Sequence, residues 1–371
     1  MNNITVNPFM PSFGRIPKMV IDQQATMDNY ISHLLIKDAK YQTSLISGVR
    51  GSGKTVFLLK VKHNYEKNDN HFFIRLNLGQ GNLLQQLLSN LQRLSGLSLQ
   101  DILQSIQEVN ILGNGISFQN SQNGQTDYID YFSALKLILE KFQKKNISIL
   151  VGIDEIEVSD DTRSFASVYQ SLIGEDLDIS LIMTGLPNKI SELQREDTLT
   201  FLLRSNHITL KPLDYDSVYS NYEIAFSKGK KIIEPILLER LSRSVHGYAY
   251  AFQAIGYYTW EQSKNIIDNQ TINEALSLAK KDLFHNSYEK LYTEISENDR
   301  ILLKAVASYK NEQVPVKELL EKLKWKKSYL SVYRARLIKD QLIVVPSRGY
   351  LSLTLPFFKE FIDWYEDRHL I

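Results

Sequence analysis

Gly48-Val49-Arg50-Gly51-Ser52-Gly53-Lys54-Thr55 is the stretch that decides the fold of this 371-residue chain. It matches the pattern GxxxxGK[ST] in full, between an apolar segment (43–47) and a segment with helical character (55–67). The glycines let successive main-chain N–H groups turn toward phosphate oxygens, at the positive end of the following helix. Lys54 is expected to reach the β- and γ-phosphates, and the Thr55 hydroxyl to bind Mg²⁺. These residues therefore form a predicted nucleotide-phosphate site.

A second motif follows a nearly continuous apolar stretch. Residues 147–154, ISILVGID, predict a strand covered by helices on both faces, and Asp154 stands at its carboxyl end. Because Mg²⁺ at a phosphate site needs a carboxylate from a neighbouring strand, Asp154 is its expected ligand, directly or through water. Glu155 is the expected base for the attacking water. Two alternatives stay open: Glu157 as the base, and a solvated acidic turn without a role.

Thr184 ends the next predicted strand, ISLIMTG, residues 179–185. Its side chain could touch the γ-phosphate or the attacking water, or it could cap the turn that follows. Asn188-Lys189 resembles the start of the guanine-reading motif NKxD, but Ser191 occupies the fourth position. The sequence therefore favours ATP over GTP.

Strands alternate with helices around these motifs. Helices are predicted for 25–36, 55–67, 81–94, 131–142 and 165–174, and strands for 43–48, 72–78, 147–154, 179–185 and 207–210. This alternation predicts an α/β fold, a parallel sheet flanked by helices. The Asn-, Gln- and Gly-rich stretch 110–127 predicts a surface insertion or hairpin.

The rest of the chain changes character twice. After Lys211-Pro212 the strand signals stop, and the pattern from 214 to about 284 is helical. Three further helical segments and two short strands joined by the turn PSRG follow, at 298–309, 314–323, 325–340, 342–345 and 350–355. That order is typical of a winged helix.

Composition narrows the classes of function. The chain is 43% hydrophobic and 23% charged, as in globular proteins with packed cores. A formal net charge of +1 excludes binding of polyanions by the whole surface, but not by one basic face. The absence of cysteine excludes disulfides, thiolate metal sites and cysteine nucleophiles. No apolar run is long enough to span a membrane, and the N-terminus lacks a signal-peptide pattern, so we expect a cytoplasmic protein without membrane contact.

One region carries a local excess of positive charge. Between residues 317 and 348, nine basic and three acidic residues leave +6. The third helix and the wing contact DNA in winged helix-turn-helix domains, so duplex DNA is an expected partner. The expected contact residues are Lys326, Lys327, Arg334, Arg336 and Arg348. The alternative is a protein-interaction module with a solvated basic face.

GVRGSGKT, VGIDEIE, TGLP (184–187) and TFLLRSNHITLKPL (200–213) together resemble AAA+ and STAND-like P-loop ATPases of the archaeal-ATPase and origin-recognition initiator kind. The resemblance extends over essentially the whole chain. It implies an N-terminal arm (1–20), a P-loop NTPase core (21–211), an all-helical lid (212–285) and a winged helix domain (286–371).

The resemblance also implies roles for single residues: Walker A for Lys54 and Thr55, Walker B with the catalytic glutamate for Asp154 and Glu155, and sensor 1 for Thr184. Arg204 corresponds to an arginine that reaches a neighbouring subunit's γ-phosphate, which implies ATP-dependent self-association. Arg195, or a solvated helix end at Arg204, is the alternative. Tyr250, in HGYAYAFQAIG, stands where initiators often carry the sensor 2 arginine. Fewer contacts to the γ-phosphate imply slow hydrolysis and switch-like behaviour.

The function favoured by these features is an Mg²⁺-dependent ATPase switch coupled to DNA binding, of the initiator or mobile-element type. A rival is a STAND-like signalling or defence NTPase whose winged helix packs against protein. A third reading is a regulatory ATPase with a protein partner.

Overall fold

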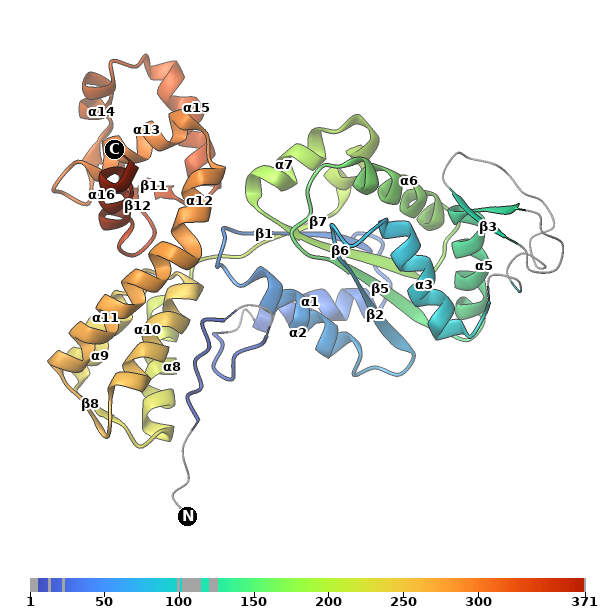
Figure 1. Ribbon diagram of the computed structural model, residues 1–371, viewed down its shortest axis with the longest axis horizontal. Helices are drawn as coiled ribbons and strands as arrows, with labels where there is room; N and C mark the ends of the chain where they lie inside the picture. The colour runs from blue at the N-terminus through green and yellow to red at the C-terminus, as the bar shows by residue number, and fades with distance from the viewer. Residues whose placement is uncertain are drawn as a thin grey trace. The chain divides into compact units, whose positions relative to one another are not determined.

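The computed structural model describes residues 6–12, 15–21, 24–98, 101, 115–119 and 126–369. The chain forms two compact units, and Figure 1 follows its course by colour. The first unit comprises residues 1–22, 48–56 and 210–371, and the second comprises 23–47 and 57–209. The phosphate-loop motif therefore belongs to the first unit and the acidic strand end to the second.

The second unit is built on a five-stranded sheet. Its strands are β1 (Thr43–Ser47), β2 (His71–Leu76), β5 (Ser148–Ile153), β6 (Ile179–Gly185) and β7 (Asn206–Thr209). Their order is β2-β5-β6-β1-β7, and every neighbouring pair runs parallel. β5 is buried along its whole length, as a strand covered on both faces must be. The parallel sheet predicted from the sequence is confirmed.

Helices cover both faces of this sheet, as Figure 1 shows. One face carries α3 (Leu83–Ser95), α5 (Tyr131–Gln143) and α6 (Asp160–Gly174), and the other carries α1 (Gln24–Leu35) and α2 (Lys54–Tyr65). Five leucines of α3 recur at helical spacing and are buried, which fixes the face that α3 turns to the core: Leu83, Leu84, Leu87, Leu88 and Leu91. α7 (Pro187–Arg195) and the 3₁₀ helix η1 (Asp197–Arg204) lead into β7.

The polar stretch 110–127 contains strands of a hairpin. β3 (Gly115–Gln119) pairs antiparallel with β4 (Thr126–Asp130). Residues 110–114 and 120–125 of the predicted insertion lie outside the described residues.

The helical region of the first unit is built from α8 (Tyr215–Lys228), α9 (Pro235–Arg243), α10 (Ala249–Gln262) and α11 (Asn269–Leu283). The expectation of an all-helical region is wrong in one detail. β8 (Ile232–Ile233) and β9 (Ile266–Ile267) form a two-stranded parallel sheet between these helices. Strands of two residues are too short to leave an alternating pattern in the sequence.

The described part of the N-terminal arm packs into this helical region. Phe9 is buried, and its ring contacts the rings of Tyr222, Phe226 and Phe252. A Cβ at Gly256 would lie 2.6 Å from that ring, so α10 needs glycine there.

Beyond α11 the chain continues as the π-helix η2 (Phe284–Tyr288) and α12 (Glu289–Glu294) into the winged helix. This domain comprises α13 (Glu297–Ala307), β10 (Val314–Pro315), α14 (Val316–Leu323), α15 (Lys327–Lys339), β11 (Ile343–Val344), β12 (Tyr350–Leu353) and α16 (Phe358–His369). The strands form an antiparallel sheet in the order β10-β12-β11. Three helices and the two-stranded wing match the predicted order, and α16 and β10 are additions.

Candidate functional site

The phosphate loop holds its own lysine. Lys54 begins α2, and its Nζ donates hydrogen bonds of 2.9 Å to the main-chain oxygens of Gly48 and Val49. The side chain is only 8% exposed. A further bond of 3.2 Å, from Ser52 N–H to the Val49 oxygen, closes the turn. The ammonium group is therefore enclosed by the loop that the sequence motif defines.

Glycine is required at two positions of this loop. Gly51 and Gly53 have φ values of +77° and +93°, in the left-handed region that disfavours side chains. A Cβ at Gly51 would also lie 2.2 Å from the Tyr248 hydroxyl, whereas at Gly53 no atom lies within 4 Å. The loop is thus packed tightly on one side and open on another.

Two tyrosines around the start of α10 contact the loop backbone. The Tyr248 hydroxyl donates to the Arg50 carbonyl oxygen at 2.7 Å and hydrogen-bonds Ser287 Oγ at 2.6 Å. Burial raises the pKa of Tyr248 well above its ordinary value, so the hydroxyl keeps its proton. The main-chain N–H of Tyr250 donates to the Gly51 oxygen at 3.0 Å. The backbone oxygens of the loop are therefore held by the helical region.

The side chains of Arg50 and Tyr250 have partners elsewhere in the first unit. Arg50 Nη2 lies 3.2 Å from Glu294 Oε1. The Tyr250 hydroxyl donates to Asp282 Oδ1 at 2.6 Å. The residue at the predicted sensor 2 position is thus tied to α11 by its polar end.

In the second unit, Asp154 follows β5 and is held by two neighbouring strands. The buried Thr184 hydroxyl on β6 donates to Asp154 Oδ1. On the other side, Arg75 Nη2 from β2 donates to Asp154 Oδ2 at 3.2 Å. The Asp154 side chain is 11% exposed. Both carboxylate oxygens therefore have protein partners.

Glu155 adopts an unusual backbone conformation beside this aspartate. Its φ is +55°, a left-handed value that costs a non-glycine residue on the order of 1–2 kcal/mol. Its N–H donates to Thr184 Oγ1 at 3.3 Å, and the N–H of Ile156 donates to the Thr184 carbonyl oxygen at 2.8 Å. Thr184 therefore fixes the backbone of Glu155 and Ile156. The side chains of Glu155 and Glu157 are both exposed. Strain of this kind is concentrated at functional sites.

The predicted metal ligands have the right chemistry for Mg²⁺. Thr55 and Asp154 offer a hydroxyl and a carboxylate, the oxygen donors that this ion prefers. Among the residues that the structure describes, no group of three or more His, Cys, Asp or Glu could hold a metal ion.

The candidate arginine finger lies at the surface of the second unit. Arg204 is the last residue of η1 and is exposed, and the neighbouring Leu203 is 60% exposed. Arg195 ends α7 and is also exposed.

The five predicted DNA-contacting residues fall into two groups. Lys326 and Lys327 at the start of α15 and Arg348 in the wing turn are exposed. Arg336, in contrast, pairs at 2.9 Å with Asp299, whose side chain is 2% exposed, and Arg334 is half-buried with its Nε enclosed. α15 instead exposes the apolar side chains Tyr329 (42%) and Val332 (55%). Arg336, although 44% exposed, is thus ion-paired within its own domain.

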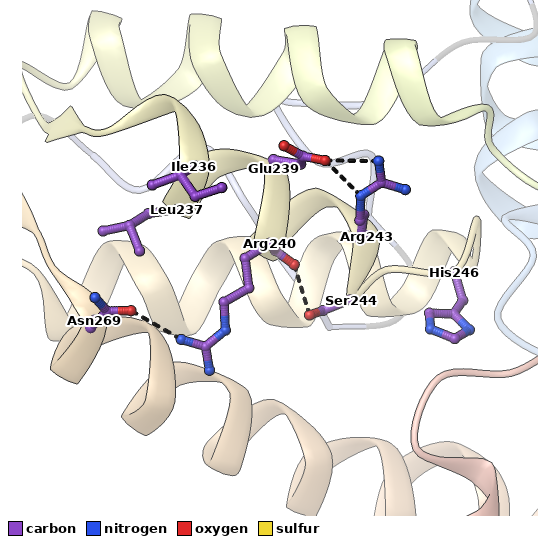
Figure 2. A pocket seen from close by; sticks show the side chains of 8 residues that line it. All are labelled: Ile236, Leu237, Glu239, Arg240, Arg243, Ser244, His246 and Asn269. Carbon is purple, nitrogen blue, oxygen red and sulfur yellow. Dashed lines mark hydrogen bonds and ion pairs between the residues drawn. The ribbon is translucent and has the colours of Figure 1, made fainter. Parts of the chain in front are cut away.

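A groove of about 600 Å³ in the helical region contains none of the predicted site residues. It is lined by Ile236, Leu237, Glu239, Arg240, Arg243, Ser244, His246 and Asn269 (Figure 2). Figure 2 shows Arg243 paired with Glu239, and Arg240 hydrogen-bonded to the side chain of Asn269. We assign no nucleotide contact to this groove.

Comparisons with known proteins agree with this geometry in fold. Over 97% of this chain and 98% of the other, the structure is similar to the ORC2 protein of Aeropyrum pernix in its ADPNP–ADP complexes, with 15% identity and a TM-score of 0.62. A Walker-type ATPase of Pyrococcus abyssi is similar over 93% and 96%, with 15% identity and a TM-score of 0.60. The chain has the AAA+ P-loop ATPase fold.

Two further comparisons concern the sequence. Residues 285–362, which cover the winged helix as far as the first part of α16, match a family described as Domain of unknown function (DUF8462). No curated protein sequence matches the chain significantly. In the described ranges, no helix combines the length and the apolar character needed to cross a membrane.

Sequence reasoning missed two residues that contact the predicted site. Arg75 is the one charged residue of the predicted strand FFIRLNL, and that contrast with its apolar neighbours is the signal that could have found it. Tyr248 belongs to the segment HGYAYAFQAIG, but nothing in the sequence indicates that it contacts residue 50, 198 positions earlier.

Proposed function

We propose that this chain is an Mg²⁺-dependent ATPase that acts as a slow nucleotide switch. The observation that carries the proposal is the complete phosphate loop, in which the ammonium group of Lys54 is bonded to the main-chain oxygens of Gly48 and Val49. Phosphate oxygens can replace these oxygens as partners of the ammonium group, with the gain of a full negative charge. The A. pernix ORC2 structure contains ADPNP and ADP, which supports an adenine nucleotide here.

The remaining residues have roles that follow from their chemistry. The N–H groups of residues 48–55 bind the phosphates, and Thr55 and Asp154 hold Mg²⁺. When bound, the ion neutralises charge on the β- and γ-phosphates. Glu155 accepts the proton of the attacking water, and Thr184 keeps Glu155 and Asp154 in place.

Slow turnover is supported by Tyr250. At the position where initiators often carry an arginine, this chain offers a tyrosine whose hydroxyl is already bonded to Asp282. No positive charge is supplied to the γ-phosphate from this position. The switch therefore stays in its ATP state for longer than in a chain with a sensor 2 arginine.

The test of this function is nucleotide binding by the full chain. Lys54→Ala removes the ammonium group and should abolish measurable ATP affinity in a calorimetric titration. Lys62→Ala is the matched control, because Lys62 lies on the same helix and is 45% exposed. Unchanged ATP affinity in Lys54→Ala contradicts the proposal.

We also propose that ATP promotes self-association through Arg204. The exposed pair Leu203 and Arg204 at the end of η1 supports a contact with a second copy. Arg204→Ala should lower turnover and leave ATP affinity intact, and light scattering should report a larger particle with ATP. A monomer in every nucleotide state, together with full activity of Arg204→Ala, contradicts this part.

Duplex DNA is the partner that we propose for the winged helix. Lys326, Lys327 and Arg348 are exposed and cationic, which supports phosphate contacts. Replacing these three residues by glutamate should abolish DNA binding and preserve ATP affinity. In the wild type, log affinity should fall with log salt at a slope of about −0.9 per phosphate contact. Salt-independent binding contradicts such contacts.

A second function, the STAND-like signalling NTPase, is favoured by the outer face of α15. There Val332 and Tyr329 are exposed, while Arg336 is paired with Asp299. A face that exposes apolar side chains, and on which one arginine is ion-paired, suits a protein surface better than a DNA groove. Nucleotide-driven assembly without any DNA binding at low salt would select this function.

A further inference from the structure

The carboxylate expected to bind Mg²⁺ already has a cationic partner. Arg75 stands on β2, and the register pairs Arg75 with Gly152 and Leu76 with Ile153 on β5. The guanidinium therefore reaches the residue that follows β5, and Arg75 Nη2 lies 3.2 Å from Asp154 Oδ2. This ion pair joins the outermost strand of the sheet to the predicted metal ligand.

Thr184 and Arg75 differ in how easily a cation can displace them from Asp154. Thr184 is fully buried and also accepts the Glu155 N–H, so the hydroxyl on Oδ1 is fixed by two bonds. Arg75 is 37% exposed, so its guanidinium can move into water at little cost. Oδ2 is therefore the oxygen that an arriving cation can take over.

We propose that Arg75 is the resident counter-ion of Asp154 and that Mg²⁺ must displace it. The inference rests on the proposed function, in which Asp154 binds Mg²⁺. A guanidinium and a divalent cation at one carboxylate oxygen repel each other, so the two states exclude one another. Arg75 thereby raises the Mg²⁺ concentration that the nucleotide complex requires, and it keeps the strand end neutralised when no nucleotide is bound.

The experiment measures binding of mant-ATP, a fluorescent ATP analogue, by the full chain as Mg²⁺ is added. The half-saturating Mg²⁺ concentration should fall about threefold to tenfold in Arg75→Gln, since a partly exposed ion pair and one nearby positive charge are removed. Arg75→Lys keeps the charge and should stay closer to the wild type.

Arg163 provides a matched control. It is 38% exposed and pairs with Asp160 and Glu196 rather than with Asp154. Arg163→Gln should therefore leave the Mg²⁺ requirement unchanged. Equal shifts in Arg163→Gln and Arg75→Gln would overturn the proposal, because a general change in charge would then explain both.

A double-mutant cycle assigns the effect to Asp154. In the Asp154→Asn background the carboxylate is gone, so Arg75→Gln should cause no further shift in the Mg²⁺ requirement. An unchanged or raised Mg²⁺ requirement in Arg75→Gln, with mant-ATP still bound, overturns the proposed role of Arg75 but leaves the proposed ATPase function standing. If the wild type binds mant-ATP without any dependence on Mg²⁺, the metal part of the proposed function fails instead.

Discussion

Lys54 in the phosphate loop and Asp154 at the strand end are both bonded to other groups of the protein, but to partners of different kinds. Lys54 is held by main-chain oxygens five and six residues earlier in the chain. Asp154 is held by the side chains of Thr184 and Arg75, which are 30 and 79 residues away. These bonds of Lys54 are local in the sequence, whereas those of Asp154 depend on the fold of the sheet. A substitution in the loop should therefore disturb contacts within the loop. A substitution at Thr184 or Arg75, on neighbouring strands, should change the surroundings of Asp154.

The largest expected effect tests the strand end. Glu155→Gln should preserve ATP affinity and reduce turnover by about 10²–10⁴-fold, because the carboxylate that takes the proton from water is lost. Turnover is measured by phosphate release at saturating ATP. Glu157→Gln is the control, since Glu157 is also exposed. If Glu157→Gln loses turnover and Glu155→Gln does not, Glu157 rather than Glu155 is the base for the attacking water.

The second effect tests how tightly Tyr248 packs against the phosphate loop. Gly51→Ala introduces left-handed strain of about 1–2 kcal/mol and also a clash with Tyr248, whereas Gly53→Ala introduces the strain alone. The thermal unfolding midpoint of the nucleotide-free protein should therefore fall further in Gly51→Ala. Equal midpoints for the two variants would mean that Tyr248 moves aside at no cost, so that its packing against the loop is not tight.

The third effect tests whether Thr184 supports the acidic pair. Thr184→Val keeps the shape but removes the hydroxyl, and so the bonds to Asp154 and Glu155, each of which contributes about 0.5–1.5 kcal/mol. We expect a lower unfolding midpoint and lower turnover. Thr184→Ser retains the hydroxyl and should restore much of both. Full turnover in Thr184→Val would show that Glu155 keeps its conformation without this bond.

The smallest expected effect concerns the ion pair between Arg50 and Glu294. Glu294 is 39% exposed, and exposed pairs contribute about 0.2–1 kcal/mol. Glu294→Gln should therefore change the unfolding midpoint by very little and leave ATP affinity intact. A large loss of ATP affinity in this variant would mean that the loop is less self-contained than the contacts of Lys54 indicate.

The same contrast explains how much of the molecule could be predicted from its sequence. The phosphate loop and the strands that lead to Asp154 and Thr184 leave local signals, namely glycines at fixed spacing and continuous apolar runs. The structure confirms the parallel sheet, and the similarity in fold confirms the AAA+ resemblance.

What escaped prediction consists of contacts across long separations and elements too short for periodicity. The pairing of Arg75 with Asp154 needs the strand order β2-β5, which no local pattern specifies. The ion pair of Arg336 with Asp299 likewise joins two helices, across 37 residues. Helical spacing indicates the helix face on which a residue lies. It does not indicate whether another helix places a carboxylate next to that face.

The contact of the N-terminal arm with α10 has a consequence for the order of folding. Asn7 bonds to Glu261, and Met10 to Gln253, across 254 and 243 residues. On the ribosome the arm emerges first, and its partners emerge only after all of the second unit has been made. Closing so long a stretch of chain costs entropy that grows with its length, and a folded second unit shortens the free chain that must be closed. We therefore expect the sheet to form early, and the phosphate loop, held by Tyr248 and Tyr250 of the same late region, to be completed last.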